Sequence, residues 1–436
     1  MIGQEIDRQN SSEDYLEVSS LNQLIYTNNE CKVRLTENIV MTGAVTVNNG
    51  NRLTIDLNGH TLTALENSRA FFIQNGALTI EDSIGGGVIQ GSGTVNGYGG
   101  AILMNGSDSN NALTLTGGTI RGFNAGYGAG VYMGNGTFHM TGGAIQNCSA
   151  TDGGGVYVDG GSFKMTNGTI SDCKAANAGG GVYVSSGSFA MTGGSIEDCT
   201  AYEGAGVKVY PSSGKTASFS MSGGTIEGSS RDGVSIAAID SGTSEFSMSG
   251  GTIKDNSRYG VWVDNGSAVM SGGSVKGSER YDIYIGSRAA LKVNDTQVGG
   301  TVLNMGKITG QGSAEFTGTV ENSGSAVAEI TGCKIHRIEH RSPYNGTIEG
   351  SPDEYVYLLG RSWPTAKIPS AAGESISLKV SSYLPPVMEN TLEVPAGVTV
   401  TVDLAGKTLS AANSDLKIIN HGTLTLIDSS TGGTLS

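Results

Sequence analysis

A tetrapeptide that recurs in the middle of the chain places aromatic side chains where they could hold a sugar ring. In Gly-Val-x-Val, as in residues 155–158 and 181–184, apolar residues alternate with variable ones. On a strand with one buried side, x should therefore face outward. The residues at x, in chain order, are Tyr132, Tyr157, Tyr183, Lys208, Ser235, Trp262 and, in a looser copy, Tyr284.

Rings at this position on neighbouring parallel strands would stand about 4.8 Å apart, a spacing that allows offset stacking. We predict that the aromatic members of the column bind a ligand, namely Tyr132, Tyr157, Tyr183, Trp262 and Tyr284. The alternative is that tyrosine merely suits an exposed strand.

Two carboxylates have a spacing that suits acid–base chemistry. Asp172 and Asp198 follow Ser171 and Glu197 in successive repeats. In a stacked fold they would lie one above the other, and paired carboxylates can act as acid and base in glycoside cleavage. The alternative is a pair of solvated turn residues.

A short segment near residue 335 contains residue types that bind zinc. Cys333, His336 and His340 lie within eight residues, with Glu339 among them. On a strand, Cys333 and His336 would point to opposite faces, so a single histidine pair would remain. Because such a pair is a weak ligand set, we predict no metal and no other cofactor.

All these residues are positioned by one repeat. The segment Phe-His-Met-Thr-Gly-Gly-Ala-Ile at 138–145 returns, edited, through residues 113–275. The apolar residues that close its copies are Ile120, Ile145, Ile170, Ile196, Ile226, Ile253 and Val275, with spacings of 25, 25, 26, 30, 27 and 22. Such a period indicates a solenoid or a propeller, and a propeller blade needs about 40 residues.

The chemistry of each repeat is that of strands. Apolar residues alternate with variable ones, helical spacing is absent, and glycine punctuates every copy. Three short strands in about 25 residues fit one coil of a parallel β-helix, with right-handed crossovers. Like residues then stack in columns, and Gly142 and Gly143 form a corner because glycine accepts positive φ. We predict an all-β, right-handed parallel β-helix with three-strand coils.

The Met-Thr-Gly-Gly-(Thr/Ser)-Ile repeat resembles the right-handed β-helix repeats of pectin-lyase-like bacterial cell-surface and adhesin-like proteins. The resemblance covers roughly residues 40–330. It implies the β-helical fold and an extracellular, cell-surface location, but not by itself an enzyme. The hydrolase pattern of Asp-Asp, Gly-His-Gly and Arg-Ile-Lys is absent, since Arg337 and Ile338 are followed by Glu339.

Composition narrows the range of partners. The 436 residues include 69 glycines and carry a net charge of −14. This charge argues against nucleic acid, whose recognition depends on lysine and arginine at the phosphates, and against unaided capture of acidic polysaccharides. No apolar run reaches the ~18 residues of a membrane-spanning helix. Residues 1–10 are polar and do not form a signal peptide, so an exported protein would have lost it.

Three of the five cysteines form a column of their own. Cys148, Cys173 and Cys199 each follow a ladder isoleucine by three residues, and Ser229 and Asn256 continue the series. We expect buried, reduced thiols that act as small apolar side chains. A disulfide between neighbouring coils is the alternative, although stacked parallel side chains suit it less well.

The chain divides into three parts. Residues 1–38 form a tail and an N-terminal cap, with a short capping helix expected at 19–26; the β-helix runs through 39–341. Residues 342–436 hold seven of the eight prolines, which should interrupt regular stacking. They form a connector and a smaller C-terminal β segment, in which residues 400–409 repeat 53–62. We therefore expect the start of a second β-helix and a longer tandem chain, with Asp56 and Asp403 in matching structural turns.

Three classes of function remain open. The leading hypothesis is a non-catalytic surface module, an adhesin-like stalk that binds a glycan or a host or cell-surface protein. The second is a polysaccharide lyase or glycoside hydrolase. The third is a purely structural spacer without a ligand.

Overall fold

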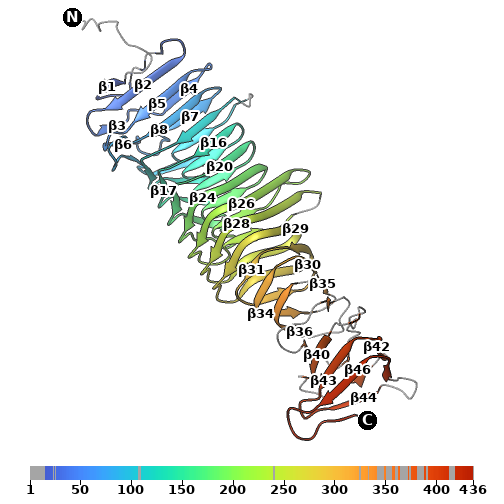
Figure 1. Ribbon diagram of the computed structural model, residues 1–436. Helices are drawn as coiled ribbons and strands as arrows, with labels where there is room; N and C mark the ends of the chain where they lie inside the picture. The colour runs from blue at the N-terminus through green and yellow to red at the C-terminus, as the bar shows by residue number, and fades with distance from the viewer. Residues whose placement is uncertain are drawn as a thin grey trace, which may run out of the picture.

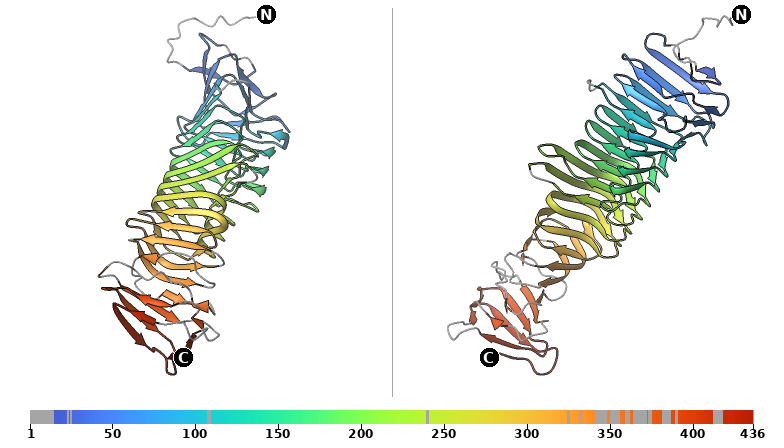
Figure 2. Two further views of the ribbon diagram at one scale, coloured as in Figure 1. Left: turned by 90° about the vertical axis from the view of Figure 1, so that its right-hand side faces the viewer. Right: turned by 180° about the vertical axis from the view of Figure 1, so that it is seen from behind.

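The computed structural model describes residues 15–22, 24, 26–106, 110–238, 241–323, 326–331, 333–340, 348–349, 356–358, 362–363, 372, 375–380, 387–388, 391–411 and 418–435. Within these ranges the regular secondary structure is β-strand throughout. Figures 1 and 2 show an elongated stack of coils, with the N-terminus at one end and the C-terminus at the other.

Strands of successive coils pair in parallel ladders. The first ladder contains β4 (Val45–Asn48), β7 (Phe71–Gln74), β11 (Ile102–Met104), β15 (Val131–Met133), β19 (Val156–Val158), β23 (Val182–Val184), β25 (Val207–Val209) and β27 (Val234–Ile236). The second contains β1 (Leu16–Val18), β2 (Glu30–Leu35), β5 (Arg52–Asp56), β8 (Ala77–Glu81), β12 (Ala112–Leu115), β16 (Thr137–Met140) and β20 (Ser162–Met165). The third contains β3 (Ile39–Val40), β6 (Thr61–Thr63), β9 (Val88–Gln90), β13 (Thr119–Arg121), β17 (Ala144–Gln146) and β21 (Thr169–Ser171).

Farther along the chain the ladders merge into longer strands. These are β24 (Gly187–Glu197), β26 (Thr216–Glu227), β28 (Thr243–Lys254), β29 (Tyr259–Lys276) and β30 (Tyr281–Val293). They are followed by β31 (Gln297–Val298), β32 (Val302–Asn304), β33 (Lys307–Gly310), β34 (Glu315–Asn322), β35 (Val327–Thr331), β36 (Lys334–His340) and β37 (Ile348–Glu349). In these later coils Val302 pairs with Val320 and Val320 with Ile338, a shorter repeat, as the degenerate sequence indicates.

A fourth short strand occurs in the N-terminal half, beyond the three strands predicted for each coil. The strands β10 (Thr94–Tyr98), β14 (Asn124–Tyr127), β18 (Ser149–Asp152) and β22 (Lys174–Ala178) form a separate parallel sheet. This short sheet precedes the first ladder in each coil. It continues after β22 only as single bridges from Lys174 to Thr200 and from Ala178 to Glu203.

The core consists of the apolar columns that the sequence predicts. Phe138, Phe163 and Phe189 stack at centroid separations of 4.6 Å, and each is at most 1% exposed. Ile145 pairs with Ile170, and Ile170 with Ile196, all fully buried. Since one coil cannot bury its apolar face alone, the stack is the stable unit. The predicted parallel β-helix is confirmed.

The glycine doublet forms the predicted corner. Gly143 has φ of +70°, a conformation that costs residues with a Cβ more than it costs glycine. A Cβ on its neighbour Gly142 would collide with the carbonyl of Thr116 in the coil below. Two separate requirements, conformation and space, therefore keep this corner free of side chains.

The predicted N-terminal helix is wrong for the described residues of that stretch. Leu16–Val18 form β1, which pairs with β2, and the described residues of 19–26 are irregular. Leu21 is buried, and Leu24 and Tyr26 pack against the core. A strand can satisfy the backbone groups of the open edge directly, whereas a helix cannot. For this reason the end is covered by β1 and an irregular apolar segment.

The C-terminal part holds the remaining strands. They are β38 (Val356–Leu358), β39 (Ser362–Trp363), β40 (Ser375–Val380), β41 (Val387–Met388), β42 (Leu392–Val394), β43 (Thr399–Asp403), β44 (Thr408–Ala411), β45 (Ile418–Asn420), β46 (Thr423–Ile427) and β47 (Thr434–Leu435). One ladder continues through β36, β38, β40, β43 and β46, so parallel pairing persists beyond all seven prolines of this part.

No helix in the described ranges has the length and apolar character needed to cross a membrane.

Candidate binding face

The structure places the predicted outward residues in one column of the first ladder. Tyr132 pairs with Tyr157 and Tyr157 with Tyr183, and the column continues through Lys208, Ser235, Trp262 and Tyr284. They are less exposed than an outward position suggests. Tyr132, Lys208 and Ser235 are buried, and Tyr157, Tyr183, Trp262 and Tyr284 are partly buried.

This burial arises because the chain folds back over the column at a glycine corner. Gly153 lies so close to the strand that a Cβ there would stand 2.8 Å from Cβ of Tyr157. The same contact recurs one coil on, where a Cβ on Gly179 would stand 2.6 Å from Cβ of Tyr183. Both glycines have positive φ. The corner therefore packs against the tyrosines and covers one side of each.

Neighbouring tyrosine rings stack on one another. The centroids of Tyr132 and Tyr157 are 5.4 Å apart with 16° between ring planes, and those of Tyr157 and Tyr183 are 4.8 Å apart with 6°. The faces between these rings are therefore occupied by other rings. Contact with a partner is left to the ring edges of the partly buried Tyr157 and Tyr183, because Tyr132 is buried and its hydroxyl donates to Asp159.

Two tyrosines that sequence reasoning missed complete the cluster. Tyr98 and Tyr127 end β10 and β14 of the short sheet, and Tyr98 is 50% exposed. Tyr98 lies 4.7 Å from Tyr132, and Tyr127 lies 5.6 Å from Tyr157 in an edge-on arrangement. Each lies immediately before a glycine corner. Their place beside the column could not be predicted, because the sequence did not indicate the fourth strand. We call Tyr98, Tyr127, Tyr132, Tyr157 and Tyr183 the aromatic face.

The phenol groups of the face are held neutral. Tyr132 Oη donates a hydrogen bond to Asp159 Oδ2 at 2.7 Å, and burial together with this carboxylate raises the pKa of Tyr132. Burial is also the main cause that raises the pKa of Tyr157 to about 12. These groups therefore offer hydroxyl hydrogen bonds and not phenolate charge at neutral pH.

Beyond Tyr183 the column changes from aromatic to cationic. Lys208 is 2% exposed, and its Nζ lies 2.8 Å from Glu203 Oε2 and 3.0 Å from Ser235 Oγ. The same Nζ lies 5.4 Å from the centre of the Trp262 ring. Lys208 thus links two neighbouring coils, because its ammonium group already donates hydrogen bonds to Glu203 and to Ser235 of the next coil.

Three arginines stand beside this cationic part. Arg258 lies 4.4 Å above the ring of Tyr259 and 5.1 Å above that of Trp262. Arg231 lies 4.8 Å from the ring of Tyr202, and Arg280 lies 5.9 Å from that of Tyr259. A guanidinium group over a ring is an attractive cation–π contact and also fixes the orientation of the side chain.

A buried carboxylate lies among these cations. Asp232 is fully buried and accepts a hydrogen bond from the Gly204 N–H at 3.3 Å. Its Oδ1 has no hydrogen-bond partner in the described part of the protein. Burial raises the pKa of Asp232, and the charges of Arg258, Arg231 and Lys208 oppose that increase.

The two carboxylates considered for acid–base chemistry lie at a different corner. Asp172 and Asp198 both have φ of +54°, in the left-handed region. The matching corners of other coils are also in this region, at Gly122, Asn147, Gly228, Asp255 and Gly277. Asparagine and aspartate tolerate this conformation better than other residues with a Cβ. The conformation accounts for both residues without any catalytic role.

The three candidate zinc ligands considered in the sequence are only partly described. Cys333 is buried and His336 is exposed, while the side chain of His340 lies outside the described set. Among the described residues, no group of three or more His, Cys, Asp or Glu side chains could hold a metal ion. The cysteine column is buried and free of disulfides, with Cys148, Cys173 and Cys199 fully inaccessible.

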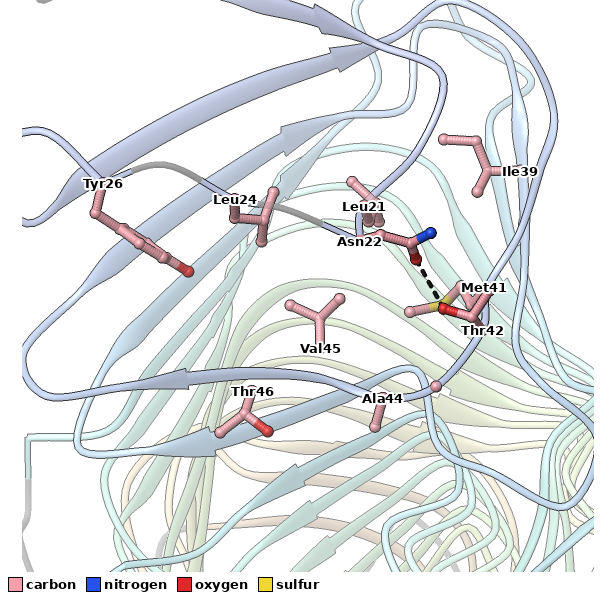
Figure 3. Close-up of a pocket in the computed structure, with 11 residues that line it drawn as sticks. Leu21, Asn22, Leu24, Tyr26, Ile39, Met41, Thr42, Ala44, Val45 and Thr46 are labelled. Atoms are coloured by element: carbon pink, nitrogen blue, oxygen red, sulfur yellow. Dashed lines mark hydrogen bonds between the residues drawn. The ribbon is translucent and has the colours of Figure 1, made fainter. Parts of the chain in front are cut away.

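A cavity of about 430 Å³ lies under the N-terminal coil. Its lining includes Leu21, Leu24, Met41 and Val45, and one hydrogen bond crosses it from Thr42 Oγ1 to Asn22 Oδ1 at 2.7 Å (Figure 3). Among the described residues that line the cavity, Tyr26 is the one titratable side chain.

Comparison with known proteins agrees with the fold. A family model described as "Right handed beta helix region" matches residues 100–298, which hold most of the aromatic face and all three arginines. No curated protein and no solved structure matches the chain significantly. The parallel coils of residues 100–298 are a right-handed β-helix region.

Proposed function

We propose that this protein is a non-catalytic, rigid surface module that holds an extended glycan along the aromatic face. The observation that carries the proposal is the continuity of that face. Five tyrosines on adjacent coils lie in one cluster, whereas much of the outer surface is serine, threonine, asparagine and glycine. An extended polymer is a suitable partner because the solenoid repeats the same side chain along its axis.

The stacking geometry defines how such a glycan would be held. Rings that cover one another leave their edges for contact, so we expect contacts to sugar hydroxyl groups along the column. The exposed Tyr98 offers a ring for stacking at the end of the cluster. An extracellular, cell-surface location is part of this proposal, and it rests on the resemblance to surface proteins.

A purely structural spacer is the second candidate. The observation that favours it is the likeness between the tyrosine stack and the core phenylalanine stack. Tyr157 and Tyr183 lie 4.8 Å apart with 6° between planes, and Phe163 and Phe189 lie 4.6 Å apart with 9°. Aromatic stacking stabilises a repeat array whether or not a ligand binds.

The tandem arrangement is also a proposal, and it is supported by the second unit. Asp403 accepts the Ala405 and Ser429 N–H groups, just as Asp56 accepts those of Asn58 and Ser83. Leu426 is 45% exposed, whereas the matching residue of the first unit, Ile80, is fully buried under the next coil.

Glycan binding can be tested on an array of neutral and acidic oligosaccharides. We expect the protein to bind an extended oligosaccharide, and Tyr98→Ala/Tyr127→Ala to weaken that binding at least tenfold. Ile84→Ala is the matched control, because Ile84 is an apolar side chain 72% exposed outside the aromatic face. An array without any bound glycan, or equal binding by the tyrosine variant, would favour the spacer.

A further inference from the structure

Three arginines form a column on consecutive coils. The Arg258 N–H donates to the Arg231 carbonyl at 2.9 Å, and the Arg280 N–H donates to the Arg258 carbonyl at 3.1 Å. Adjacent strands in a sheet are about 4.8 Å apart, so three like charges repeat at close intervals. We call Arg231, Arg258 and Arg280 the arginine column.

No ion pair joins the arginine column to a carboxylate of the described residues, although the buried Asp232 lies near enough for the charges of Arg258 and Arg231 to lower its pKa. Some other cations of this chain are paired: Lys208 Nζ lies 2.8 Å from Glu203 Oε2, and Lys254 Nζ lies 2.6 Å from Glu227 Oε2. None of the three arginines has a carboxylate within 4.0 Å among the described residues. With 40 acidic and 26 basic residues, the chain has enough carboxylates to pair every cation. A repeating unpaired charge in such a protein points to an anion from outside.

The aromatic neighbours hold the guanidinium groups without using their hydrogen bonds. Arg258 lies above the rings of Tyr259 and Trp262, and Arg231 lies above the ring of Tyr202. Ring stacking occupies the face of a guanidinium group and not its N–H groups, of which Arg231 Nε is buried without a hydrogen-bond partner in the described part of the protein. The N–H groups of a guanidinium form the planar fork that matches a carboxylate or a sulfate oxygen pair.

The column begins where the short sheet ends. From Cys148 to Val156 and from Cys199 to Val207 the chain takes eight residues, which include the fourth strand or its last bridges. From Ser229 to Val234 it takes five. The corner that holds Gly204, with φ of +51°, is then occupied by Arg231. The shorter connection thus replaces a glycine corner by an arginine, and does so on three coils in succession.

We propose that the arginine column is a subsite for the acidic groups of a glycan, either carboxylate or sulfate. This inference rests on the proposed function, because the column continues the aromatic face along the same side of the β-helix. Trp262 and Tyr284 lie beside the column and offer contacts to the sugar ring itself. The net charge of −14 opposes any polyanion, so the attraction for an acidic glycan would come locally from these three arginines, and nucleic acid is an outcome of the test.

The test uses the whole chain and four probes in affinity electrophoresis: heparin, which is sulfated; alginate, which is carboxylated; dextran, which is neutral; and single-stranded DNA. We expect retardation by heparin or alginate at low salt that is lost at about 1 M salt, where the screening length is about 3 Å. The variant Arg231→Gln/Arg258→Gln/Arg280→Gln should lose at least tenfold in affinity. Arg121→Gln is the matched control, because Arg121 is an exposed arginine on β13.

A single variant separates charge from geometry. Arg258→Lys keeps the charge and removes the fork, so we expect it to weaken binding of the acidic glycan at least threefold. Circular dichroism melts of each variant establish that the fold is retained. Retention of the probe by a folded triple variant at wild-type affinity would overturn the inference, and so would wild-type protein that binds neither heparin nor alginate. DNA bound as tightly as either glycan through the same arginines would also overturn it.

The same experiment distinguishes this inference from the proposed function. Tyr98→Ala/Tyr127→Ala should retain the salt-dependent part of acidic-glycan binding, because both tyrosines lie outside the arginine column. Loss of neutral-glycan binding in the tyrosine variant, with acidic-glycan binding lost only in the arginine variant, supports both. Binding of heparin or alginate through the arginines, with no effect of the tyrosine variant on any glycan, supports the subsite and removes the role of the aromatic face.

Discussion

Tyr157 and Tyr183 lie face to face on neighbouring coils, with ring centroids 4.8 Å apart and 6° between the ring planes. Each ring therefore serves as the packing surface of the other. An outward position on this β-helix is consequently part of an ordered second layer, and the stability of that layer can be measured separately from its binding.

Removal of one ring from the stack should lower stability. Tyr157→Ala takes away contacts to Tyr132 and Tyr183, so we expect the free energy of unfolding to fall by about 1–3 kcal/mol. Tyr157→Phe retains both contacts and should change it by less than about 1 kcal/mol. Urea unfolding followed by fluorescence provides the measurement. Equal stability of Tyr157→Ala and the wild type would show that stacking contributes nothing here.

The core column should be far more sensitive than an outward position on the adjacent strand. Ile170→Ala leaves a cavity between Ile145 and Ile196 and should cost about 2–5 kcal/mol. Lys164→Ala removes an exposed side chain and should change stability by no more than about 0.5 kcal/mol. Denaturant melts of both variants test this contrast, and comparable losses at the two sites would contradict the observed orientation of β20 and β21.

The cysteine column should be unreactive in the folded protein. Cys148, Cys173 and Cys199 are fully buried, and burial raises the pKa of Cys199 to about 12. Because all three sulfur atoms are inaccessible in the folded state, a thiol reagent should label these residues only after unfolding. The measurement is a timed reaction with such a reagent in buffer and in denaturant, followed by peptide mapping. Rapid labelling of all three in buffer would mean that the coils open readily.

The turn at Asp56, which recurs at Asp403 in the second unit, should make the free energy of unfolding depend on pH in the acid range. Burial alone would raise the pKa of Asp56, but the Arg34 hydrogen bond and the Ser83 and Asn58 N–H groups lower it below its usual value. A lowered pKa in the folded state means that this contribution is present above the unfolded value and is lost as pH falls through the folded value.

The corresponding variant is Asp56→Asn. We expect it to lower the free energy of unfolding by about 1–3 kcal/mol at pH 7, because hydrogen bonds to a charged group are lost. The difference from the wild type should shrink as the pH falls below 3.8, the usual value for this carboxyl. Urea melts at several pH values give the comparison. A difference that does not change between pH 7 and pH 2.5 would assign the loss to shape rather than to charge.

The sequence by itself determined the repeat, the strand type and the inward residues. Alternation with period two fixes which side chains face the core, and a period of about 25 residues fixes which residues stack, as for Ile145, Ile170 and Ile196. Both are local properties of the chain, so they can be read without coordinates. The buried cysteine column follows from the same argument.

Only the tertiary structure decided what covers the outward residues. Tyr132 and Lys208 are buried because the glycine corner and the short sheet return over them, and the length of that connection varies from coil to coil. The same variation places Arg258 beside Trp262 and brings Tyr98 against Tyr132. In each of these contacts, the sequence pattern of one segment does not indicate that the other segment lies beside it. They follow from the path of the backbone between strands, which hydrophobic periodicity does not specify.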